Sequence, residues 1–347
     1  MSNLVRIAAP IAVFAALALA GAARAQTAPG NQQQLIQQQQ QRRVEQPLNN
    51  APVWKEVRSG RPQFTFIPGR ETNVLIQSSG QTWRALRDGP ITRYGGWLLV
   101  VVALTIAAYY VVRGQIKLHG KPTGRLIERF GGVERIVHWS TAITFCLLGI
   151  TGLIILFGKL VLLPVIGYTL FAWLAALAKN LHNFVGPLFI LSLLATFVVF
   201  VRDNLPQAAD FKWIAKAGGM FGGREVPSGR FNAGEKGWFW IGVVILGIAM
   251  SVTGLIMLFP NFEQTRATMQ LANIVHDIGA ALFIAAGLGH IYLGTIGVQG
   301  AYQAMRTGYV DETWAKEHHE LWYEDVKSGN VAAKSGGSAA GAAQAQH

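Results

Sequence analysis

The chain has 347 residues, of which 51% are hydrophobic and only 14% are charged, and its formal net charge at pH 7 is +12. A soluble protein averages about 25% charged residues, so this composition excludes an ordinary soluble protein and indicates an integral membrane protein. The single cysteine, Cys146, excludes disulfides, covalent haem attachment through CxxCH and a cysteine-ligated iron–sulfur cluster within this chain. Basic loops of membrane proteins explain the positive charge without a nucleic-acid partner.

The N-terminal region is predicted to contain a signal peptide, a linker and a small outer segment. Residues 1–25 combine Arg6, an apolar stretch and the small-x-small sequence Ala23-Arg24-Ala25, which is typical of a secretory signal, although an uncleaved anchor helix is the alternative. Residues 26–51 are rich in Gln and are predicted to form a flexible linker. Residues 52–93 are too few for a core of their own, so we expect this periplasmic segment to fold against the membrane face or a partner.

Five apolar stretches follow, each near the length of about 20 residues that a bilayer requires. They predict membrane spans at residues 94–112, 138–158, 182–201, 237–259 and 272–293. The predicted fold class is therefore an all-α integral membrane protein, with a four-helix bundle over residues 138–293 and one extra N-terminal transmembrane helix. Residues 113–137 form a basic loop, and residues 294–347 form a tail that is predicted to be disordered at its end.

The charges of the loops predict how the chain is oriented, because cytoplasmic loops are enriched in Lys and Arg. The loops after the first and third spans are strongly basic, whereas the intervening loops contain only Lys159, Lys179 and Arg266. Arg84, Arg87 and Arg93 precede the first span and disagree with this orientation, but the signal peptide supports it. We therefore expect a multi-pass protein of the bacterial inner membrane with a periplasmic mature N-terminus and a cytoplasmic C-terminus. The basic residues are Arg113, Lys117, Lys121, Arg125, Arg129 and Arg135 in the first such loop, and Arg202, Lys212, Lys216, Arg224, Arg230 and Lys236 in the second.

Four histidines lie within or at the ends of the apolar spans, where ionisable side chains are costly and mark functional sites. His276 and His290 are 14 residues apart on one helix, which places them on nearly the same face and about 21 Å apart along the axis. With the predicted orientation, His182 lies at the outer depth of His276 and His138 at the inner depth of His290. The sequence therefore predicts two histidine pairs, one above the other.

Such pairs are typical of six-coordinate b-type haem, in which one imidazole binds the iron from each side. We interpret the four histidines as axial ligands of two haem b groups, the alternative being hydrogen bonds between helices. Four glycines are predicted either to make room beside a flat macrocycle or to form ordinary helix contacts. They are Gly152, Gly186, Gly279 and Gly287. Arg135 and Arg202 are candidates for pairing with haem propionates or for anchoring at the lipid interface.

Several motifs, in this order and spacing, resemble the cytochrome b (gamma) subunit of membrane-bound formate dehydrogenase over residues 125–327. They are Arg135-Ile136-Val137-His138-Trp139, Leu181-His182-Asn183-Phe184-Val185-Gly186, Phe231-Asn232-Ala233-Gly234-Glu235-Lys236, His276 with His290-Ile291-Tyr292, and Trp314-Ala315-Lys316-Glu317-His318-His319-Glu320-Leu321-Trp322-Tyr323. The resemblance implies four core helices, two b haems with iron ligated by the four histidines, and a quinone site near the cytoplasmic surface.

The resemblance carries the quinone site onto Asn232 and Gly234, with His290 close by. The alternative is that Asn232 caps a helix whose first turn contains Gly234 and Glu235. His318 and His319 lie in an amphipathic tail that reads as an interfacial helix, and metal binding by them is the weaker interpretation. The N-terminal region through the first span has no counterpart in the family, and we expect it to dock to outer partner subunits.

Together these features predict a membrane-anchor subunit of anaerobic respiration. It would pass electrons from a periplasmic iron–sulfur beta subunit, fed by a catalytic formate dehydrogenase alpha subunit, through two haems to menaquinone or ubiquinone. Nothing in this chain indicates the formate-oxidising centre itself. Two alternatives stay open: a diheme cytochrome b of another respiratory oxidoreductase such as a hydrogenase, and a haem-free membrane transporter or scaffold that uses its histidines for protons or metal.

Overall fold

The computed structural model of the chain describes residues 33–34, 36–38, 40–41, 51–60, 79–216, 218, 226–262, 264–329 and 335–336. The predicted signal peptide lies outside these residues, as do most of the Gln-rich linker and the end of the tail. The chain divides into two units, Met1–Ile91 with Leu255–Val275, and Thr92–Gly254 with His276–His347.

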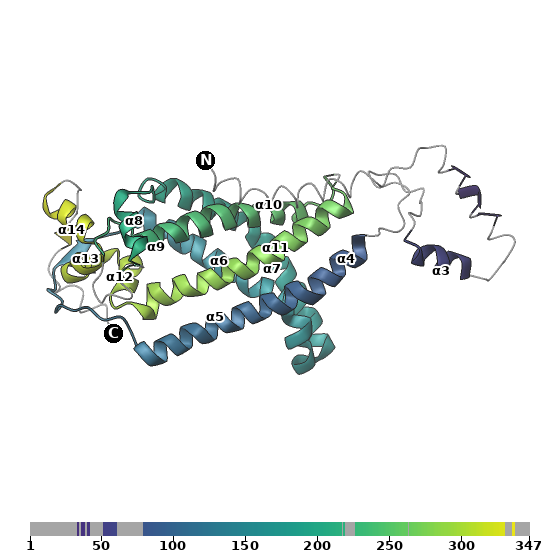
Figure 1. The fold of residues 1–347 in the computed structure, drawn as a ribbon, viewed down its shortest axis with the longest axis horizontal. Helices are drawn as coiled ribbons and strands as arrows, with labels where there is room; N and C mark the ends of the chain where they lie inside the picture. Colours follow the sequence, from purple (N-terminus) through teal and green to yellow (C-terminus); the bar gives the residue numbers. More distant parts are fainter. Residues whose placement is uncertain are drawn as a thin grey trace. The chain divides into compact units, whose positions relative to one another are not determined.

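Five helices in the described part of the chain are long and apolar enough to cross a membrane, which confirms the predicted number of spans (Figure 1). Each is longer than its predicted span, because helices continue beyond the apolar core of a bilayer. The first, Ser79–Arg113, consists of α4 (Ser79–Leu86), the π-helical η1 (Arg87–Ile91) and α5 (Thr92–Arg113). The second is α6 (Gly132–Val161) and the third is α7 (Leu163–Phe200). The fourth, Ala233–Leu258, consists of α9 (Ala233–Gly237), the π-helical η3 (Trp238–Leu246) and α10 (Gly247–Leu258), and the fifth, Arg266–Gly297, consists of α11 (Arg266–Tyr292) and the π-helical η4 (Leu293–Gly297).

In the first unit, polar contacts hold α4, the start of the first membrane helix. The Trp83 indole donates a hydrogen bond of 3.0 Å to the Asn273 side chain, and the Ser79 hydroxyl lies 3.3 Å from the Gln270 side chain. The unit also contains the short helix α3 (Ala51–Arg58). Residues 79–91 belong to the same helical stretch, Ser79–Arg113, as the first predicted span.

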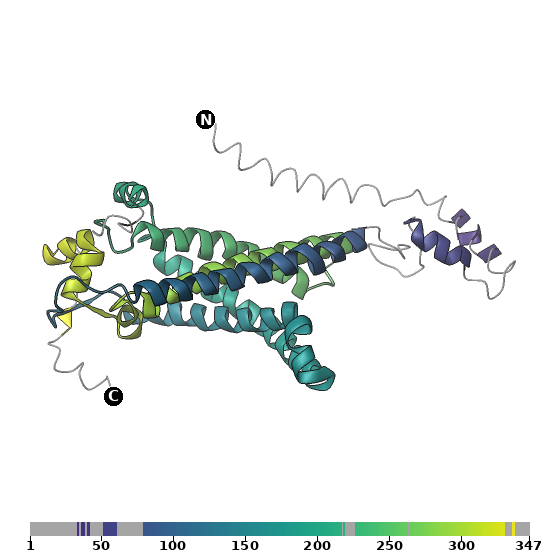
Figure 2. The same ribbon diagram turned by 60° about the horizontal axis from the view of Figure 1, so that its bottom comes forward.

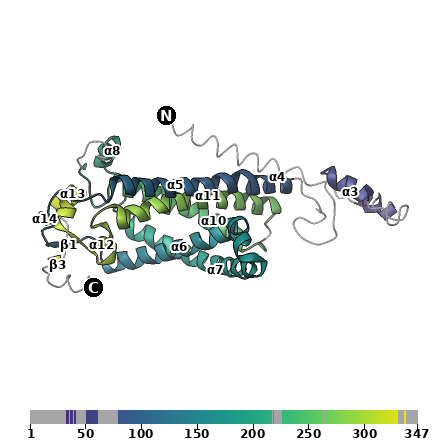
Figure 3. The same cartoon turned by 90° about the horizontal axis from the view of Figure 1, so that it is seen from below.

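In the second unit, the predicted bundle is formed by α6, α7, η3, α10 as far as Gly254 and α11 from His276 onward. Its interior is a cluster of Phe189, Leu193 and Phe283, against which Phe145 and Trp238 pack. The extra helix α5 runs beside α11, as Figure 3 shows. The rings of Tyr109 and Tyr110 on α5 meet the Tyr292 ring of α11 edge-on. This arrangement confirms the predicted fold class, a four-helix bundle with one additional N-terminal membrane helix.

The connection between the second and third spans differs from the prediction. Residues 159–181 are helical almost throughout, and α7 starts at Leu163 with a proline in its first turn, where its missing N–H costs nothing. Gly167 has a φ of 75°, a conformation that glycine adopts without steric penalty, and it marks a kink near the start of α7. Lys159 and Lys179 thus lie on helices and not in a loop.

At the end of the bundle that carries His138, a small sheet joins the basic loop to the tail. The strand β1 (Leu126–Glu128) pairs antiparallel with both β2 (Tyr309–Asp311) and β3 (Ser335–Gly336), which gives the order β2-β1-β3. Three short helices surround it, α12 (Ala301–Arg306), α13 (Glu312–His318) and α14 (Glu320–Lys327), and α8 (Ala208–Ala215) follows the third span (Figure 2). We refer to β1, β2 and α12 to α14 as the cap.

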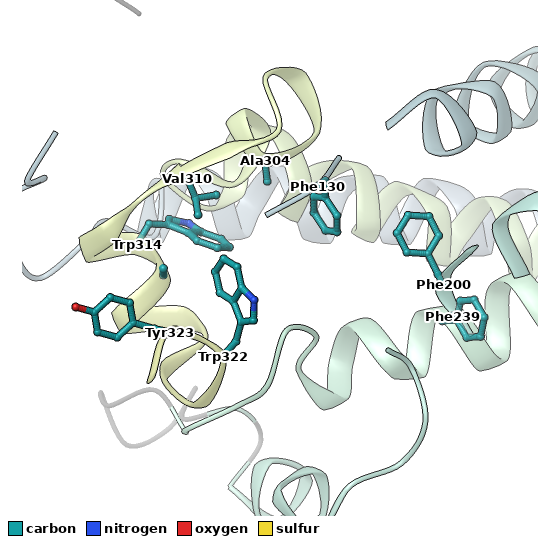
Figure 4. Close-up of a cluster of buried hydrophobic side chains, with 9 residues drawn as sticks. Phe130, Phe200, Phe239, Ala304, Val310, Trp314, Trp322 and Tyr323 are labelled. Atoms are coloured by element: carbon teal, nitrogen blue, oxygen red, sulfur yellow. The ribbon is translucent and has the colours of Figure 1, made fainter. Parts of the chain in front are cut away.

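The aromatic side chains of the tail belong to the protein core. Trp314, Trp322 and Tyr323 are buried together with Phe130 and Phe200, and Figure 4 shows this cluster. The prediction of an interfacial helix is therefore wrong for this segment. Strand pairing of β2 with β1 holds α13 and α14 against the bundle, so their large aromatic surfaces are buried in protein and not in lipid headgroups.

A network of charged groups lies between the cap and the bundle. The Arg129 guanidinium is 5% exposed and donates hydrogen bonds to Glu235 (3.0 Å) and to the Arg230 carbonyl (2.9 Å). It also lies over the Trp314 ring, 4.8 Å from its centre. Arg230 in turn pairs with Glu134 at 2.8 Å. The cap is thus held by buried charges as well as by aromatic packing.

The buried His319 of the cap makes stability depend on pH. Burial and the nearby Arg129 lower the pKa of His319 to about 3, against the opposing charge of Glu235, and its Nδ1 lies 2.8 Å from the Gly229 carbonyl. The unfolded chain takes up a proton on this histidine below about pH 6.5, whereas the folded chain does not, so stability is lost as the pH falls from 6.5 towards 3. We expect thermal unfolding of the purified protein, followed by circular dichroism, to show this loss between about pH 7 and pH 5. His319→Gln should reduce the slope, and an unchanged slope would contradict this account.

Candidate functional site

The four histidines that the sequence singles out meet as two pairs. His182 of α7 and His276 of α11 have ring centres 6.2 Å apart, with an angle of 69° between the ring planes. His138 of α6 and His290 of α11 have ring centres 6.3 Å apart, with an angle of 54°. We refer to His182 and His276 as the outer pair and to His138 and His290 as the inner pair, after the depths that loop charge predicts.

The separation within each pair fits two imidazoles on opposite sides of one iron. A metal–imidazole bond is about 2 Å long and the ring centre lies about 1 Å beyond the nitrogen, so two axial rings are about 6 Å apart. In the described part of the chain, no group of three or more His, Cys, Asp and Glu side chains could hold a metal ion. Two imidazoles are too few for an ordinary metal site, but they suffice for an iron whose other four ligands come from a porphyrin.

The surroundings of the inner pair also suit a bound group. Among the described residues, the Nδ1 atom of His138 is buried and has no hydrogen-bond partner. A buried polar atom without a partner costs free energy of folding, so a histidine here is expected to have another role. His290 lies at the end of an apolar helix and is nevertheless exposed. Trp238 stacks on the His290 ring at 4.9 Å with an angle of 13°, and Trp139 meets His138 edge-on at 5.4 Å. The residues present therefore fit haem.

Two threonines hold the outer pair, and the sequence reading did not identify them. The Thr151 hydroxyl lies 2.9 Å from Nδ1 of His182, and the Thr253 hydroxyl lies 2.9 Å from Nδ1 of His276. Each hydroxyl donates its proton to a carbonyl of its own helix. Thr151 donates to the Leu147 carbonyl at 2.7 Å, and Thr253 donates to the Ala249 carbonyl at 2.6 Å. Because a hydroxyl has one proton, each threonine oxygen must accept from Nδ1–H of its histidine. This fixes the tautomer in which Nε2 is bare and available to a metal.

Of the glycines that the sequence predicted beside the macrocycle, Gly152 lies closest to a proposed ligand. A Cβ atom at Gly152 would lie 3.4 Å from Cε1 of His182, and one at Gly254 would lie 3.5 Å from Cε1 of His276. A Cβ at Gly186 would meet nothing within 4 Å, whereas Gly279 and Gly287 are in contact with neighbouring side chains, those of Met250 and Phe145. Gly254 was not among the glycines predicted from the sequence. It directly follows Thr253, just as Gly152 directly follows Thr151.

Asn232 and Gly234 lie at the start of the fourth span. Asn232 is the N-cap of α9, where its side chain accepts from the Glu235 N–H at 2.9 Å while the Glu235 carboxylate accepts from the Asn232 N–H at 2.9 Å. A Cβ at Gly234 would lie 2.9 Å from the Trp213 ring, so the absence of a side chain there admits a tryptophan of α8. The capping interpretation is confirmed, and Trp238, six residues after Asn232, reaches the inner pair.

Three of the four remaining candidates, Arg135, His318 and His319, contact the cap or belong to it. Arg135 donates to the Arg306 carbonyl at 3.3 Å, and Arg202 is exposed at the end of the third span. The rings of His318 and His319 lie 5.0 Å and 5.2 Å from the Trp314 ring. The Glu235 carboxylate lies 3.8 Å from Nε2 of His319.

Membrane-spanning helices that carry two imidazole pairs at different depths are the architecture of a membrane-bound cytochrome b. A profile of the family named prokaryotic cytochrome b561 matches residues 129–308. The chain therefore belongs to the prokaryotic cytochrome b561 family.

Curated relatives agree with this assignment. The chain is 33% identical over 210 residues to the "Formate dehydrogenase, cytochrome b556(fdo) subunit" of Escherichia coli strain K12, covering 58% of this chain and 93% of that protein. It is 28% identical over 214 residues to the nitrate-inducible b556(Fdn) subunit of the same strain, with the same coverage. It is 27% identical over 202 residues to the "Formate dehydrogenase, cytochrome b556 subunit" of Haemophilus influenzae, covering 55% and 79%. The resemblance inferred from the motifs is thus confirmed, and α5 precedes the region that the family profile matches.

Proposed function

We propose that this protein is the cytochrome b subunit that anchors a formate dehydrogenase complex in the bacterial inner membrane and carries electrons between its outer partner and quinone. The observation that carries this proposal is the presence of two imidazole pairs, with ring centres 6.2 Å and 6.3 Å apart, at two depths of one bundle. The formate dehydrogenase subunits among its relatives support the choice of complex.

The four histidines hold the redox groups in place in this proposal. Haem b, when bound, supplies reversible one-electron transfer at each pair. His182 and His276 bind at the outer depth, where an iron–sulfur beta subunit delivers electrons that a catalytic alpha subunit takes from formate. His138 and His290 bind about 21 Å further along the direction of α11. The helices exclude water between the two depths and fix the order in which electrons pass.

The cytoplasmic end receives the quinone. Trp238 stacks on His290, and α9 begins six residues earlier at Asn232. The Asn232 side-chain oxygen caps α9, which leaves its amide N–H groups to donate to a quinone carbonyl. The cap lies at this end because both basic loops, which we assign to the cytoplasm, flank it. The mature N-terminus is then periplasmic, and the segment before residue 94 docks to the outer subunits.

The proposal is tested with the complex purified from its native membrane and reconstituted into quinone-containing vesicles. Formate should reduce haem b and then the quinone. Asn232→Asp keeps a capping oxygen and removes the amide donor, so quinone reduction should fall about tenfold with unchanged haem content, as expected for one lost hydrogen bond. Asn183→Asp on α7, whose amide oxygen accepts from Lys179, is the matched control. A complex whose haem is reduced by hydrogen and not by formate would instead support the hydrogenase alternative.

A further inference from the structure

The two helices that hold the outer pair carry the same short sequence. Residues 151–157 of α6 read Thr-Gly-Leu-Ile-Ile-Leu-Phe, and residues 253–259, which begin in α10, read Thr-Gly-Leu-Ile-Met-Leu-Phe, so the two differ only at the fifth position. The partner helices also correspond. His182 and His276 are each followed, after five residues, by Leu-Phe-Ile. An internal repeat therefore generates the outer pair, with one threonine and one histidine from each half.

The repeat places equivalent hydrogen bonds on both outer histidines. Thr151 is 4% exposed and Thr253 is 7% exposed, so neither bond competes with water. Both distances to Nδ1 are 2.9 Å, and both hydroxyls are oriented by donation to a carbonyl four residues earlier. Donation from Nδ1–H to a fixed acceptor makes the imidazole a stronger electron donor through its other nitrogen.

The inner pair departs from the repeat. His138 lies 13 residues before Thr151, but the equivalent position in the other half, 13 residues before Thr253, is Trp240. His290 lies 14 residues after His276, but the equivalent position, 14 residues after His182, is Thr196. Each inner histidine therefore lacks a counterpart in the other half. Among the described residues, no hydroxyl is bonded to the imidazole of His138, whose Nδ1 is buried without a partner, and His290 is stacked on the Trp238 ring.

We propose that Thr151 and Thr253 are positioning residues that set the reduction potential of the outer haem below that of the inner haem. A stronger imidazole donor stabilises ferric over ferrous iron, and both axial ligands of the outer site are strengthened while the inner ones are not. Electrons that enter at His182 and His276 then move downhill towards His138 and His290. This inference rests on the haem binding of the proposed function, but not on the identity of the donor or of the quinone.

The test is a potentiometric titration of purified protein followed by α-band absorbance. His138→Ala leaves the outer site to titrate alone and His182→Ala leaves the inner one, which assigns the two potentials. In the His138→Ala background, Thr151→Val and Thr253→Val should each favour the reduced state by about threefold, a positive shift of about 28 mV at 59 mV per tenfold change. Thr→Ser at either position should restore the original value. Thr144→Val in α6 and Ser251→Ala in α10, whose hydroxyls bond only groups other than the four histidines, should cause no shift.

Three results would overturn the inference while leaving the proposed function intact. They are an outer potential above the inner one in these assigned variants, threonine variants that behave as their controls do, or a shift that serine fails to reverse. If a valine variant loses its haem, the inference is still tested by the order of the outer and inner potentials in the His138→Ala and His182→Ala variants. Absence of haem from the unaltered protein would contradict the proposed function itself, so the two failures are distinguishable.

Discussion

Replacing His182 or His276 with alanine is expected to remove one haem b per chain, and replacing His138 or His290 is expected to remove the other. In the proposed function each pair, with ring centres 6.2 Å or 6.3 Å apart, would hold the iron of one haem, and the loss of either member would leave that iron with one protein ligand. The two sites draw on different helices except for α11, which serves both. The loss at one site should therefore leave the other occupied.

This expectation is measured by pyridine-haemochrome quantitation and reduced-minus-oxidised spectra of each purified variant. His119→Ala is the control, because the His119 side chain is 73% exposed and pairs with Glu317 on the cap. The double variant His182→Ala/His276→Ala should retain as much haem as either single variant. Pairing by depth would be contradicted if the double variant His182→Ala/His290→Ala retained a normally ligated haem, or if single variants that fold normally kept both haems.

The second large effect is expected from Glu235→Ala, which should destabilise the cap by about 3 kcal/mol. Glu235 neutralises the buried Arg129 and closes the capping box with Asn232, so its removal leaves a guanidinium without its carboxylate. The value lies at the lower end of the range for a broken buried pair, because the Glu235 side chain keeps 36% of its surface exposed.

Thermal unfolding and limited proteolysis of the tail would measure this loss. Glu324→Ala, on the exposed surface of α14, is the control and should leave the unfolding temperature unchanged. The double variant Arg129→Leu/Glu235→Leu should recover part of the lost stability, because replacing both charges removes the desolvation cost together with the attraction. A Glu235→Ala protein as stable as the control would show that the ion pair does not hold the cap.

The membrane spans and the histidine pairs could be predicted because both depend on simple periodicity. Apolar runs of bilayer length predict helices, and 14 residues along α11 place His276 and His290 on one face at two depths. Helix ends were less predictable. Residues 159–181 contain Lys159 and Lys179 and read as a loop, but α7 begins at Leu163 because Pro164 and Gly167 suit the start and the kink of a helix.

The burial of the cap and the roles of the two threonines could not be predicted from periodicity. Trp314, Trp322 and Tyr323 have the amphipathic spacing of an interfacial helix, but in the fold they are buried. Their burial depends on the pairing of β2 with β1, two strands that are about 185 residues apart in the sequence. Thr151 and Thr253 resemble ordinary threonines of apolar helices, which bond their own backbone. The repeated sequence that contains them is the signal that could have identified them.

Binding of haem b by the two imidazole pairs is measured by a dithionite-reduced minus oxidised spectrum of the purified, unaltered protein with pyridine-haemochrome quantitation. We expect two b haems per chain, both six-coordinate and low-spin in the ferric state. A well-folded protein that contains no haem would contradict haem binding by these histidines and would leave a membrane transporter or scaffold lined with histidines.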